Sequence, residues 1–513
     1  MKFAHLGAVV FGALTLAACG GDDNSSGSTP TISTLNVTLS APSVDVIVQE
    51  GGSATFSVTA NYTGTPSGTV FADVQFKDRR FALAGNPAGN GSSYGVDFKT
   101  VDLPAGGKTA TEVTFRLCTD ANCTGVYPGS TKTFTVNLDV RLEDWGTFQR
   151  NGAHTGYVAA NYDVANFTKV WEVTGNRLFP PAATADTVLV TMVEQQGTSY
   201  PTLVRALSTA DGTEKWKYDL GSQSYVSGPA VAGGLVHVTS MESSSGSNPQ
   251  WVFDLATGAF KQQMHFASQW SSFNQPVPFS DSVYLASGYY GNVVYAFDPI
   301  AGAKRWDVNG SGGKIWDGQS PAVDGQFVYY YSGTALDVID RNTGVIVRSI
   351  ADPDWSWGGY SWQSAPVLDG KGKVFLFSSD RGFATPSNIM SFDTTAGTVG
   401  WKSTAQYNTA FAYANGTIYA VRSDAHVLSA IDAESGSIKW STPLPTSDAF
   451  TGNVVVAGRH AFVSTDGQTW AIDLKSDGHK VVWSAPTGGK LAITPGNLLL
   501  TVQNTKMTAY KLF

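Results

Sequence analysis

The chain has 513 residues, of which only 14% are charged, and its formal net charge is −8. It contains no basic cluster, so binding to nucleic acid or to an acidic membrane surface through basic residues is not expected. The low charge and the 55 glycines are typical of an all-β protein outside the cytoplasm.

Residues 1–18 have the pattern of a secretion signal. Lys2 supplies the positive start, and residues 4–18 are mainly apolar or small over a stretch too short to span a membrane. The stretch ends Leu16-Ala17-Ala18-Cys19, which resembles a bacterial lipobox. That resemblance implies cleavage before Cys19 and lipid on its thiol and new amino group. An ordinary secretory signal followed by a chance cysteine is the alternative.

The residues after Cys19 predict a tether and a membrane. Glycine, and not the aspartate that resembles an inner-membrane retention signal, follows the cysteine, which favours the outer membrane. Residues 19–33 are rich in Gly, Ser and Asp and predict a lipidated flexible tether that spans on the order of 20 Å.

Residues 34–142 predict a first folded domain. Apolar and polar residues alternate in at least two stretches, such as Val113 to Leu117 and Phe134 to Val140, and Gly- and Pro-containing turns separate the strands. About 110 residues of this kind fit an immunoglobulin-like β-sandwich. We expect it to be a spacer; a second ligand-binding module is the alternative.

Cys118 and Cys123 are the two cysteines that remain after the lipobox. They lie between two strand patterns, and in an oxidising compartment this spacing predicts a disulfide across a hairpin loop. Zinc binding is the weaker interpretation, because no histidine lies nearby in the sequence to complete the ligands.

Residues 143–513 contain a recurring phrase. Its clearest copies are Ala-Phe-Asp-Pro-Ile-Ala-Gly-Ala-Lys-Arg-Trp at 296–306 and Ala-Ile-Asp-Ala-Glu-Ser-Gly-Ser-Ile-Lys-Trp at 430–440. Successive copies are 38 to 53 residues apart, which is the length of one four-stranded propeller blade. The aligned positions are Ser208, Asp254, Asp298, Asp340, Asp393, Asp432, Asp473 and Lys511.

Each phrase reads as strand, turn, strand. The Asp side chain can accept hydrogen bonds from amides of the turn, and the Gly supplies a positive φ. The final Trp is expected to wedge between neighbouring blades. Six phrases end in Trp, and two copies have Gln262 and Arg348 instead; the tryptophans are Trp171, Trp216, Trp306, Trp401, Trp440 and Trp483.

Eight copies predict an eight-bladed propeller after the sandwich. The last copy stops before its outer strand, and Phe167–Val173 is an outer strand with nothing before it. We therefore expect this segment to complete the last blade and to close the ring, which removes exposed sheet edges.

The repeat resembles the quinoprotein-type repeat of the PQQ-like propellers. The opening segment 144–157, Asp-Trp-Gly-Thr-Phe-Gln-Arg-Asn-Gly-Ala-His-Thr-Gly-Tyr, is similar to the start of many such propellers. The resemblance covers residues 144–513 and implies the fold. One member of this family is the lipoprotein subunit of the outer-membrane β-barrel assembly machine, so the resemblance also implies an envelope protein as partner. That subunit usually has no added sandwich domain.

A PQQ-dependent dehydrogenase is the enzyme alternative. By family resemblance such enzymes need a calcium site of carboxylate and amide side chains, an Asp base and often adjacent cysteines. No cysteine follows Cys123, and no haem motif is present. The histidines have no metal-ligand spacing, and His154 and His237 are expected to be packed or structural. We therefore predict no catalysis, no PQQ and no metal.

Aromatic residues in loops are the remaining signal. These loops follow the Trp strands and are expected to open onto one face around the central channel. Exposed aromatic residues beside polar ones mark binding surfaces, although rings that fill gaps between blades are the alternative. The candidates are Tyr225, Trp270, Trp316, Trp355, Trp357, Tyr360, Trp362 and Tyr407.

These observations predict a non-catalytic propeller that is lipid-anchored at the outer membrane, on its periplasmic or its outer side. Its expected partners are envelope proteins, with a role in outer-membrane protein assembly. A glycan-binding surface lipoprotein and a quinoprotein dehydrogenase are the alternatives.

Overall fold

The computed structural model describes residues 32–78, 80–100, 105–223, 225–241, 247–267, 275–287, 292–312, 320–355, 365–378, 387–422 and 424–513. The predicted signal peptide, and the tether as far as residue 31 with Cys19, lie outside this range. The described chain forms ten β-sheets and one short 3-10 helix, η1 (Val164–Asn166), which confirms the all-β class. Among these residues, no helix has the length and apolar character needed to cross a membrane.

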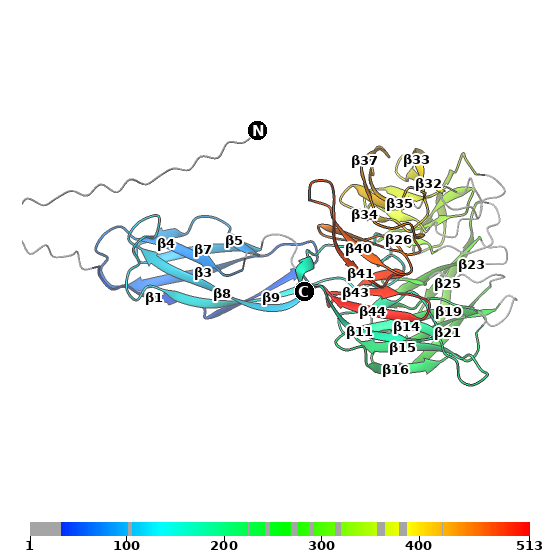
Figure 1. The fold of residues 1–513 in the computed structure, drawn as a ribbon, viewed down its shortest axis with the longest axis horizontal. Helices are drawn as coiled ribbons and strands as arrows, with labels where there is room; N and C mark the ends of the chain where they lie inside the picture. The colour runs from blue at the N-terminus through cyan, green and yellow to red at the C-terminus, as the bar shows by residue number, and fades with distance from the viewer. Residues whose placement is uncertain are drawn as a thin grey trace, which may run out of the picture.

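A narrow β-sandwich precedes a wider body of sheets (Figure 1). In the sandwich, β2 pairs with β9 in parallel, and the other strand pairs are antiparallel. The first sheet contains β1 (Asn36–Leu39), β3 (Thr55–Thr63), β7 (Ser93–Thr100), β5 (Phe81–Leu83) and β6 (Ala88–Asn90). The second sheet contains β2 (Ser43–Gln49), β9 (Lys132–Arg141), β8 (Gly107–Cys118) and β4 (Phe71–Phe76).

One apolar core joins the two sheets of the sandwich. The alternation of apolar and polar residues along β8 and β9 places Val113, Phe115 and Leu117 in this core with the alternate residues of β9. Phe98 of the first sheet lies edge-on to Phe134 of the second, with ring centroids 5.5 Å apart. The sandwich therefore has its own hydrophobic core.

Eight sheets follow the sandwich, and we number them 1 to 8 in the order in which the chain forms their two central strands. Sheet 1 contains β12 (Arg177–Leu178), β13 (Ala182–Ala183), β14 (Thr187–Val193), β15 (Thr202–Ser208) and β16 (Glu214–Asp219). Sheet 2 contains β17 (Tyr225–Val226), β18 (Ala230–Ala232), β19 (Leu235–Met241), β20 (Asn248–Asp254) and β21 (Phe260–Phe266). Sheet 3 contains β22 (Val277–Phe279), β23 (Ser282–Ser287), β24 (Val293–Asp298) and β25 (Ala303–Asn309). Sheet 4 contains β26 (Ala322–Val323), β27 (Phe327–Tyr331), β28 (Ala335–Asp340) and β29 (Ile346–Ala351).

The remaining four sheets repeat this arrangement. Sheet 5 contains β30 (Val367–Leu368), β31 (Lys373–Phe377), β32 (Ser387–Asp393) and β33 (Thr398–Tyr407). Sheet 6 contains β34 (Ala412–Ala414), β35 (Thr417–Arg422), β36 (Val427–Asp432) and β37 (Ile438–Pro443). Sheet 7 contains β38 (Val455–Ala457), β39 (His460–Ser464), β40 (Thr469–Asp473) and β41 (Val481–Ala485), with β10 (Tyr157–Val158) added in parallel to β38. Sheet 8 contains β42 (Lys490–Ile493), β43 (Leu498–Val502), β44 (Lys506–Lys511) and β11 (Thr168–Thr174).

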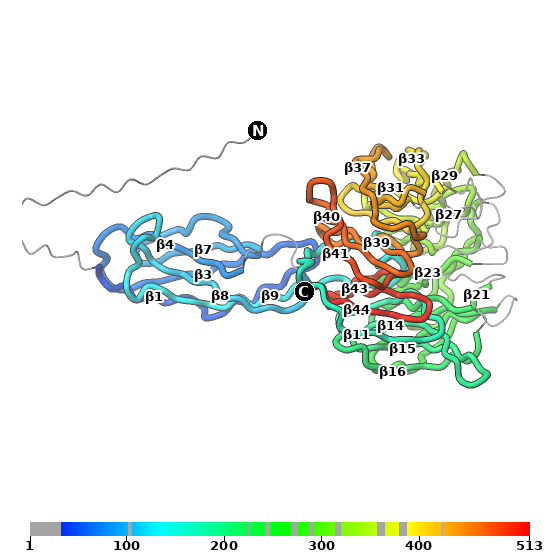
Figure 2. Tube along the Cα trace, viewed as in Figure 1, coloured from blue at the N-terminus to red at the C-terminus, as the bar shows by residue number. Residues whose placement is uncertain are grey.

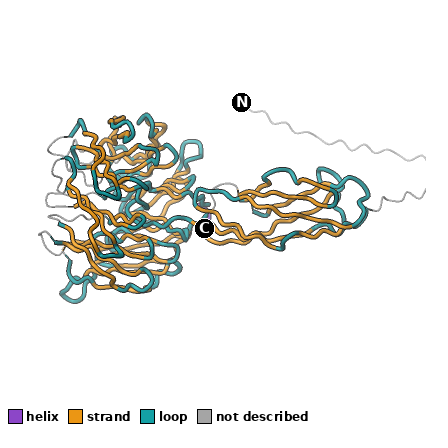
Figure 3. Tube along the Cα trace, turned by 180° about the vertical axis from the view of Figure 1, so that it is seen from behind, coloured by secondary structure: helices purple, strands orange, loops and turns teal. Residues whose placement is uncertain are grey.

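The sheets are arranged as a β-propeller. Short inner strands of successive sheets contact one another, as β18 does β22 and β34 does β38, so these strands converge on an axis. The later strands of each sheet follow in order away from the axis. The view from behind shows strands filling this wide body and loops at its ends (Figure 3).

The recurring phrase forms the third strand, the turn and the outer strand of a sheet. In sheet 3, Asp298 accepts hydrogen bonds from the amides of Ile300 and Ala301, at 2.9 and 2.8 Å. Gly302 has φ = +67°. Both properties match the predicted roles of the Asp and the Gly in the turn.

The final Trp of a phrase packs on the turn of the next sheet, as predicted. Trp306 of sheet 3 covers Gly344 of sheet 4, where a Cβ atom would lie 2.7 Å from the indole ring. Its Nε1 donates a hydrogen bond of 3.0 Å to the carbonyl of Arg341. Trp171, Trp216 and Trp401 bind the next turn through the same pair of contacts.

Gln262 and Arg348 keep the hydrogen bond although they lack the indole. The side-chain amide of Gln262 donates to the carbonyl of Pro299, and the guanidinium of Arg348 donates to that of Thr395. Each also lies over the turn glycine of the next sheet, Gly302 or Gly397. At these six positions an N–H group of the side chain binds the next turn, and Trp adds apolar contact to this hydrogen bond.

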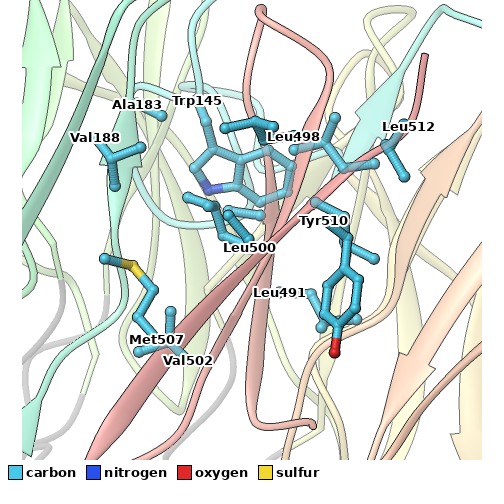
Figure 4. Close-up of a cluster of buried hydrophobic side chains, with 14 of the residues drawn as sticks. Trp145, Ala183, Val188, Leu491, Leu498, Leu500, Val502, Met507, Tyr510 and Leu512 are labelled. Atoms are coloured by element: carbon cyan, nitrogen blue, oxygen red, sulfur yellow. The ribbon is translucent and has the colours of Figure 1, made fainter. Parts of the chain in front are cut away.

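The N-terminal strand of the propeller closes the ring. β11 pairs antiparallel with β44, from Thr168 opposite Lys511 to Thr174 opposite Lys506, as the sequence predicts. Figure 2 shows the red C-terminal strands beside β11. Trp145 lies at the seam between Ala183 and Val188 of sheet 1 and Leu498 and Leu500 of sheet 8 (Figure 4).

Candidate functional site

Residues 145–158 cross one end of the propeller axis, and we call them the axial segment. Their carbonyl groups accept hydrogen bonds from short inner strands of sheets 1, 2, 4, 5, 6 and 7, so one short peptide ties six of the eight sheets together. The donor–acceptor pairs are Ala183–Trp145 (2.8 Å), Val231–Gly146 (2.7 Å), Val323–Gly152 (2.7 Å), Leu368–Ala153 (2.9 Å), Tyr413–Thr155 (2.8 Å) and Val456–Gly156 (2.8 Å).

The backbone of the axial segment is bent by residues in an uncommon conformation. Gln149, Arg150 and His154 have positive φ angles of 49°, 86° and 56°. Buried hydrogen bonds hold them there: Gln149 Nε2 donates to the carbonyl of Phe411 at 2.8 Å. The polar side chains of the segment are thus used to fix its shape.

His154 is structural, as the sequence predicts. It is fully buried, and its Nδ1 lies 2.9 Å from the carbonyl of Pro366, so Nδ1 carries the proton. Burial lowers the pKa of His154 to about 4, which keeps the ring neutral at pH 7. His237 is also buried, and burial lowers its pKa to about 3.

An ion pair joins the axial segment to the sandwich. Arg150 Nη1 donates to Glu50 Oε1 at 2.8 Å, and the side chains of both residues are almost buried, 3% and 9% exposed. The amides of Glu143 and Ala159 donate to the same carboxylate, at 2.8 and 2.6 Å. Burial alone would raise the pKa of Glu50, but the hydrogen bonds and the charge of Arg150 lower it overall.

A second contact fixes the same joint. The side chain of Asn497, from the loop between β42 and β43, makes two hydrogen bonds with the backbone of Gly106 in the sandwich. The Gly106 amide donates to Oδ1 at 2.8 Å, and Nδ2 donates to the Gly106 carbonyl at 2.7 Å. A Cβ atom at Gly106 would lie 2.6 Å from the carbonyl of Pro495, so only glycine fits. The sandwich is therefore docked on the axial end of the propeller that residues 145–158 occupy.

Replacing Glu50 by Gln is expected to lower the free energy of unfolding by about 3 kcal/mol at pH 7, because it leaves the buried guanidinium of Arg150 without its counter-charge. The expected loss of stability lies at the low end of the range for breaking a buried ion pair, because Arg150 keeps its hydrogen bonds to the Tyr157 and Glu143 carbonyls. Urea denaturation measures it. Lys77→Gln, which breaks an exposed pair with Glu112, is the matched control and should cost less than about 1 kcal/mol.

The difference in stability between wild type and Glu50→Gln is expected to depend on pH. The folded-state pKa of Glu50 is lowered, so its contribution is full above the ordinary pKa of about 4.3 and disappears as the pH falls through the folded-state value. The difference between wild type and Glu50→Gln should therefore shrink in acid. An equal difference at pH 7 and in strong acid would show that the charge is not the cause.

The described part of the predicted aromatic face gives a mixed result. Trp355 and Tyr225 are partly exposed. Tyr407 is a correction to the prediction: it is only 1% exposed, because β33 runs on to this residue and its ring packs in the apolar core between sheets 5 and 6. The other candidates, Trp270, Trp316, Trp357, Tyr360 and Trp362, lie outside the described residues.

A fixed turn presents Trp355. The buried carboxylate of Asp352 accepts a hydrogen bond of 2.5 Å from the hydroxyl of Tyr331 and one of 2.8 Å from the amide of Asp354. Asp354 in turn forms an ion pair with Lys402 of sheet 5, at 2.8 Å. Burial raises the pKa of Asp352. This support could not be predicted from the sequence, where the local signal is limited to Asp-Pro-Asp before Trp355.

Cys118 and Cys123 are joined as a disulfide, with Cα atoms 5.0 Å apart. The loop that they close is tightened by Asp120, which accepts hydrogen bonds from the amides of Asn122, Thr124 and Gly125. The hydrogen bond from the Thr124 hydroxyl, together with these amide bonds, lowers the pKa of Asp120 to about 2.

Oxidised protein is expected to give a peptide map with Cys118 bonded to Cys123. Replacing both by Ser should destabilise the sandwich alone, by roughly 2 kcal/mol, because so short a loop restricts the unfolded chain little. Two free thiols in protein secreted to the periplasm would refute the disulfide. Loss of propeller folding in the double variant would contradict the separate core of the sandwich.

The fold and the axial segment define a PQQ-like β-propeller. A family profile described as outer membrane protein assembly factor BamB matches residues 154–307 and 386–510, which is more than half of the chain. The chain therefore belongs to this family. No curated protein matches it.

Several solved structures are similar to this chain. BamB from Moraxella catarrhalis is 16% identical, with a TM-score of 0.48, over 67% of this chain and 99% of that one. AztD from Citrobacter koseri is 14% identical, with a TM-score of 0.36, over 66% and 99%. Hsv2 from Kluyveromyces lactis is 9% identical, with a TM-score of 0.34, over 52% and 86%.

Proposed function

We propose that this protein is a non-catalytic, lipid-anchored scaffold of the bacterial cell envelope that binds other envelope proteins and serves outer-membrane protein assembly. The observation that carries the proposal is the family match, since the family is described by an outer-membrane assembly factor. The sequence Leu16-Ala17-Ala18-Cys19, which resembles a lipobox, and the Gly- and Ser-rich stretch after it support the anchor and the compartment.

In this proposal each of the eight sheets is one blade of an eight-bladed propeller, and the N-terminal domain is an immunoglobulin-like spacer. The described chain starts at the end of the sandwich remote from the propeller (Figure 1). Strand β8 has 12 residues, so the sandwich is on the order of 40 Å long. A lipid on Cys19 would hold the propeller at least this far from the membrane surface when the sandwich stands upright.

The axial segment bears on the enzyme alternative. Its buried polar groups bind the backbone of the sheets, as Gln149 and His154 do, and its positive charge, Arg150, is neutralised by Glu50. These groups are structural, and the proposal therefore includes neither catalysis nor PQQ. Absorbance spectra of the protein with added PQQ and calcium test this part: a stable bound chromophore with dehydrogenase activity would contradict it.

The binding surface in this proposal includes Trp355. Because Asp352, Asp354 and Lys402 fix its turn, the ring is presented at little entropic cost, which favours a binding role. Trp355→Ala is expected to weaken partner recovery from envelope extracts by about thirtyfold, the effect of removing an interface Trp worth ~2 kcal/mol. The melting temperature should stay unchanged, because the residue lies outside the repeat.

Two variants serve as controls for this experiment. Ile300→Ala, in the turn of sheet 3, removes an exposed side chain and should change neither recovery nor melting. Asp352→Asn alters the support of the turn but keeps the indole. A Trp355→Ala protein that melts early and still binds every partner as wild type does would place the binding surface elsewhere.

A further inference from the structure

A groove lies beside the joint between the sandwich and the propeller. Its volume is about 720 Å³, within the range of roughly 300–1,000 Å³ that is usual for small-ligand sites, which often form at domain interfaces. The sandwich contributes Asp78 and Arg80, sheet 7 contributes Arg459 and Asp473, and the peptide around η1 contributes Asn166. Both domains are therefore needed to form it.

The charges of the groove are largely balanced. Arg80 forms two hydrogen bonds to Asp78 Oδ2, and Arg459 pairs with Asp473 at 2.6 Å. Asp163, a third carboxylate of the lining, accepts only a backbone amide in the described contacts. An anion in this groove would meet three carboxylates and two paired guanidinium groups, so its chemistry disfavours phosphate or carboxylate ligands.

The accessible surface of the groove combines polar groups, among them the charged Asp163 and Arg459, with apolar ones. Asn166 is exposed, and the side chain of Arg459 is 48% exposed despite its ion pair. Phe513 is 41% exposed, with the guanidinium of Arg80 over its ring, 5.8 Å from the centroid, and Val482 also lies in the lining. Amide and guanidinium groups bind hydroxyl groups as donors, the amide and carboxylate oxygens also accept, and the phenyl ring suits the apolar face of a sugar.

We propose that this groove binds a neutral saccharide of one or two sugar rings. The proposal is independent of the aromatic loops on the propeller. The walls are held in place by the ion pair of Glu50 with Arg150 and the two hydrogen bonds of Asn497 with Gly106. Because the groove is already formed, binding does not carry the entropic cost of ordering its walls, so a few contacts are enough for specific binding.

Isothermal titration calorimetry of the full lipidated chain, in a detergent without a sugar headgroup, tests the proposal. The probes are maltose, cellobiose and N,N′-diacetylchitobiose, with inorganic phosphate as the anion. At least one disaccharide should bind with a Kd of about 1 mM or below, and phosphate should bind more weakly. Asn166→Ala and Phe513→Ala should each weaken that binding at least about fivefold at unchanged melting temperature.

Ile300→Ala, which removes an exposed side chain from the turn of sheet 3, is the control, and it should bind the disaccharide as wild type does. Absence of binding for all three disaccharides would overturn the proposal, as would phosphate binding more tightly than each of them. Unchanged affinity in both Asn166→Ala and Phe513→Ala would place any saccharide outside the groove. Loss of saccharide binding in Trp355→Ala alone would assign it to the loops of the propeller.

Discussion

Removal of residues 508–513 is expected to abolish the cooperative thermal transition of the propeller. These residues form most of β44, which lies between β11 and β43 and pairs with both. Without it, both neighbours become unpaired edges, and the buried side chains of Ala509, Tyr510 and Leu512 leave the core at the seam. Calorimetry of the full and shortened chains measures the effect.

Removal of Phe513 alone is the control for this truncation. Phe513 follows β44 and is partly exposed, so its loss should leave the transition almost unchanged. If the chain without 508–513 melted at the wild-type temperature, the closure of the ring by β11 and β44 would not stabilise the fold.

Trp306→Ala is expected to cost about 3–5 kcal/mol of stability, the usual range for a large aromatic residue lost from a core. The indole is buried between sheets 3 and 4, and its loss removes both the contact with Gly344 and the hydrogen bond to the Arg341 carbonyl. The substitution therefore removes the hydrogen-bond donor of the Arg341 carbonyl as well as the apolar contact of the indole. Chemical denaturation of the purified chain gives the value.

Two further variants show what causes the loss of stability in Trp306→Ala. Ile300→Ala removes a side chain that is 78% exposed and should stay within about 0.5 kcal/mol of wild type. Trp306→Gln tests the role seen for Gln262: it should retain part of the stability if the donated hydrogen bond matters apart from the indole. Equal stability of the Ala and Gln variants would assign the whole effect to apolar contact.

The repeat could be predicted from the sequence because its determinants are local. In the clearest copies the Asp, Gly and Trp of the phrase lie within nine residues, and each acts on its own turn or on the turn of the next sheet. The closing strand could be inferred for the same reason, since Lys169-Val170-Trp171 is a copy of the end of the phrase. Position in the phrase thus implied position in the sheet.

No local sequence pattern indicates the joint between the sandwich and the propeller. Glu50 and Arg150 are 100 residues apart, and Gly106 and Asn497 are 391 residues apart. Each of these residues is ordinary in its local sequence, and only the completed ring brings Asn497 to the sandwich. Likewise, the axial segment resembled the start of a known propeller type, but its hydrogen bonds to successive sheets follow from convergence of the first strands.

The aromatic loops show a limit of composition as evidence. Tyr407 has the same sequence setting as Tyr225, at the end of a loop or strand after a Trp position. The structure separates them, since β33 extends over ten residues and carries Tyr407 into the core, whereas Tyr225 stays partly exposed. The exposure of each ring depends on where its strand ends. The local sequence pattern of these strands does not indicate that end.

Affinity purification of the tagged, lipidated protein from cross-linked bacterial envelopes, followed by mass spectrometry, tests the central claim most directly. We expect envelope proteins, with components of outer-membrane β-barrel assembly among them, to be enriched over an untagged strain, and this enrichment to fall in Trp355→Ala. A wild-type protein that folds, reaches the membrane and still enriches no envelope protein above the untagged strain would contradict the account.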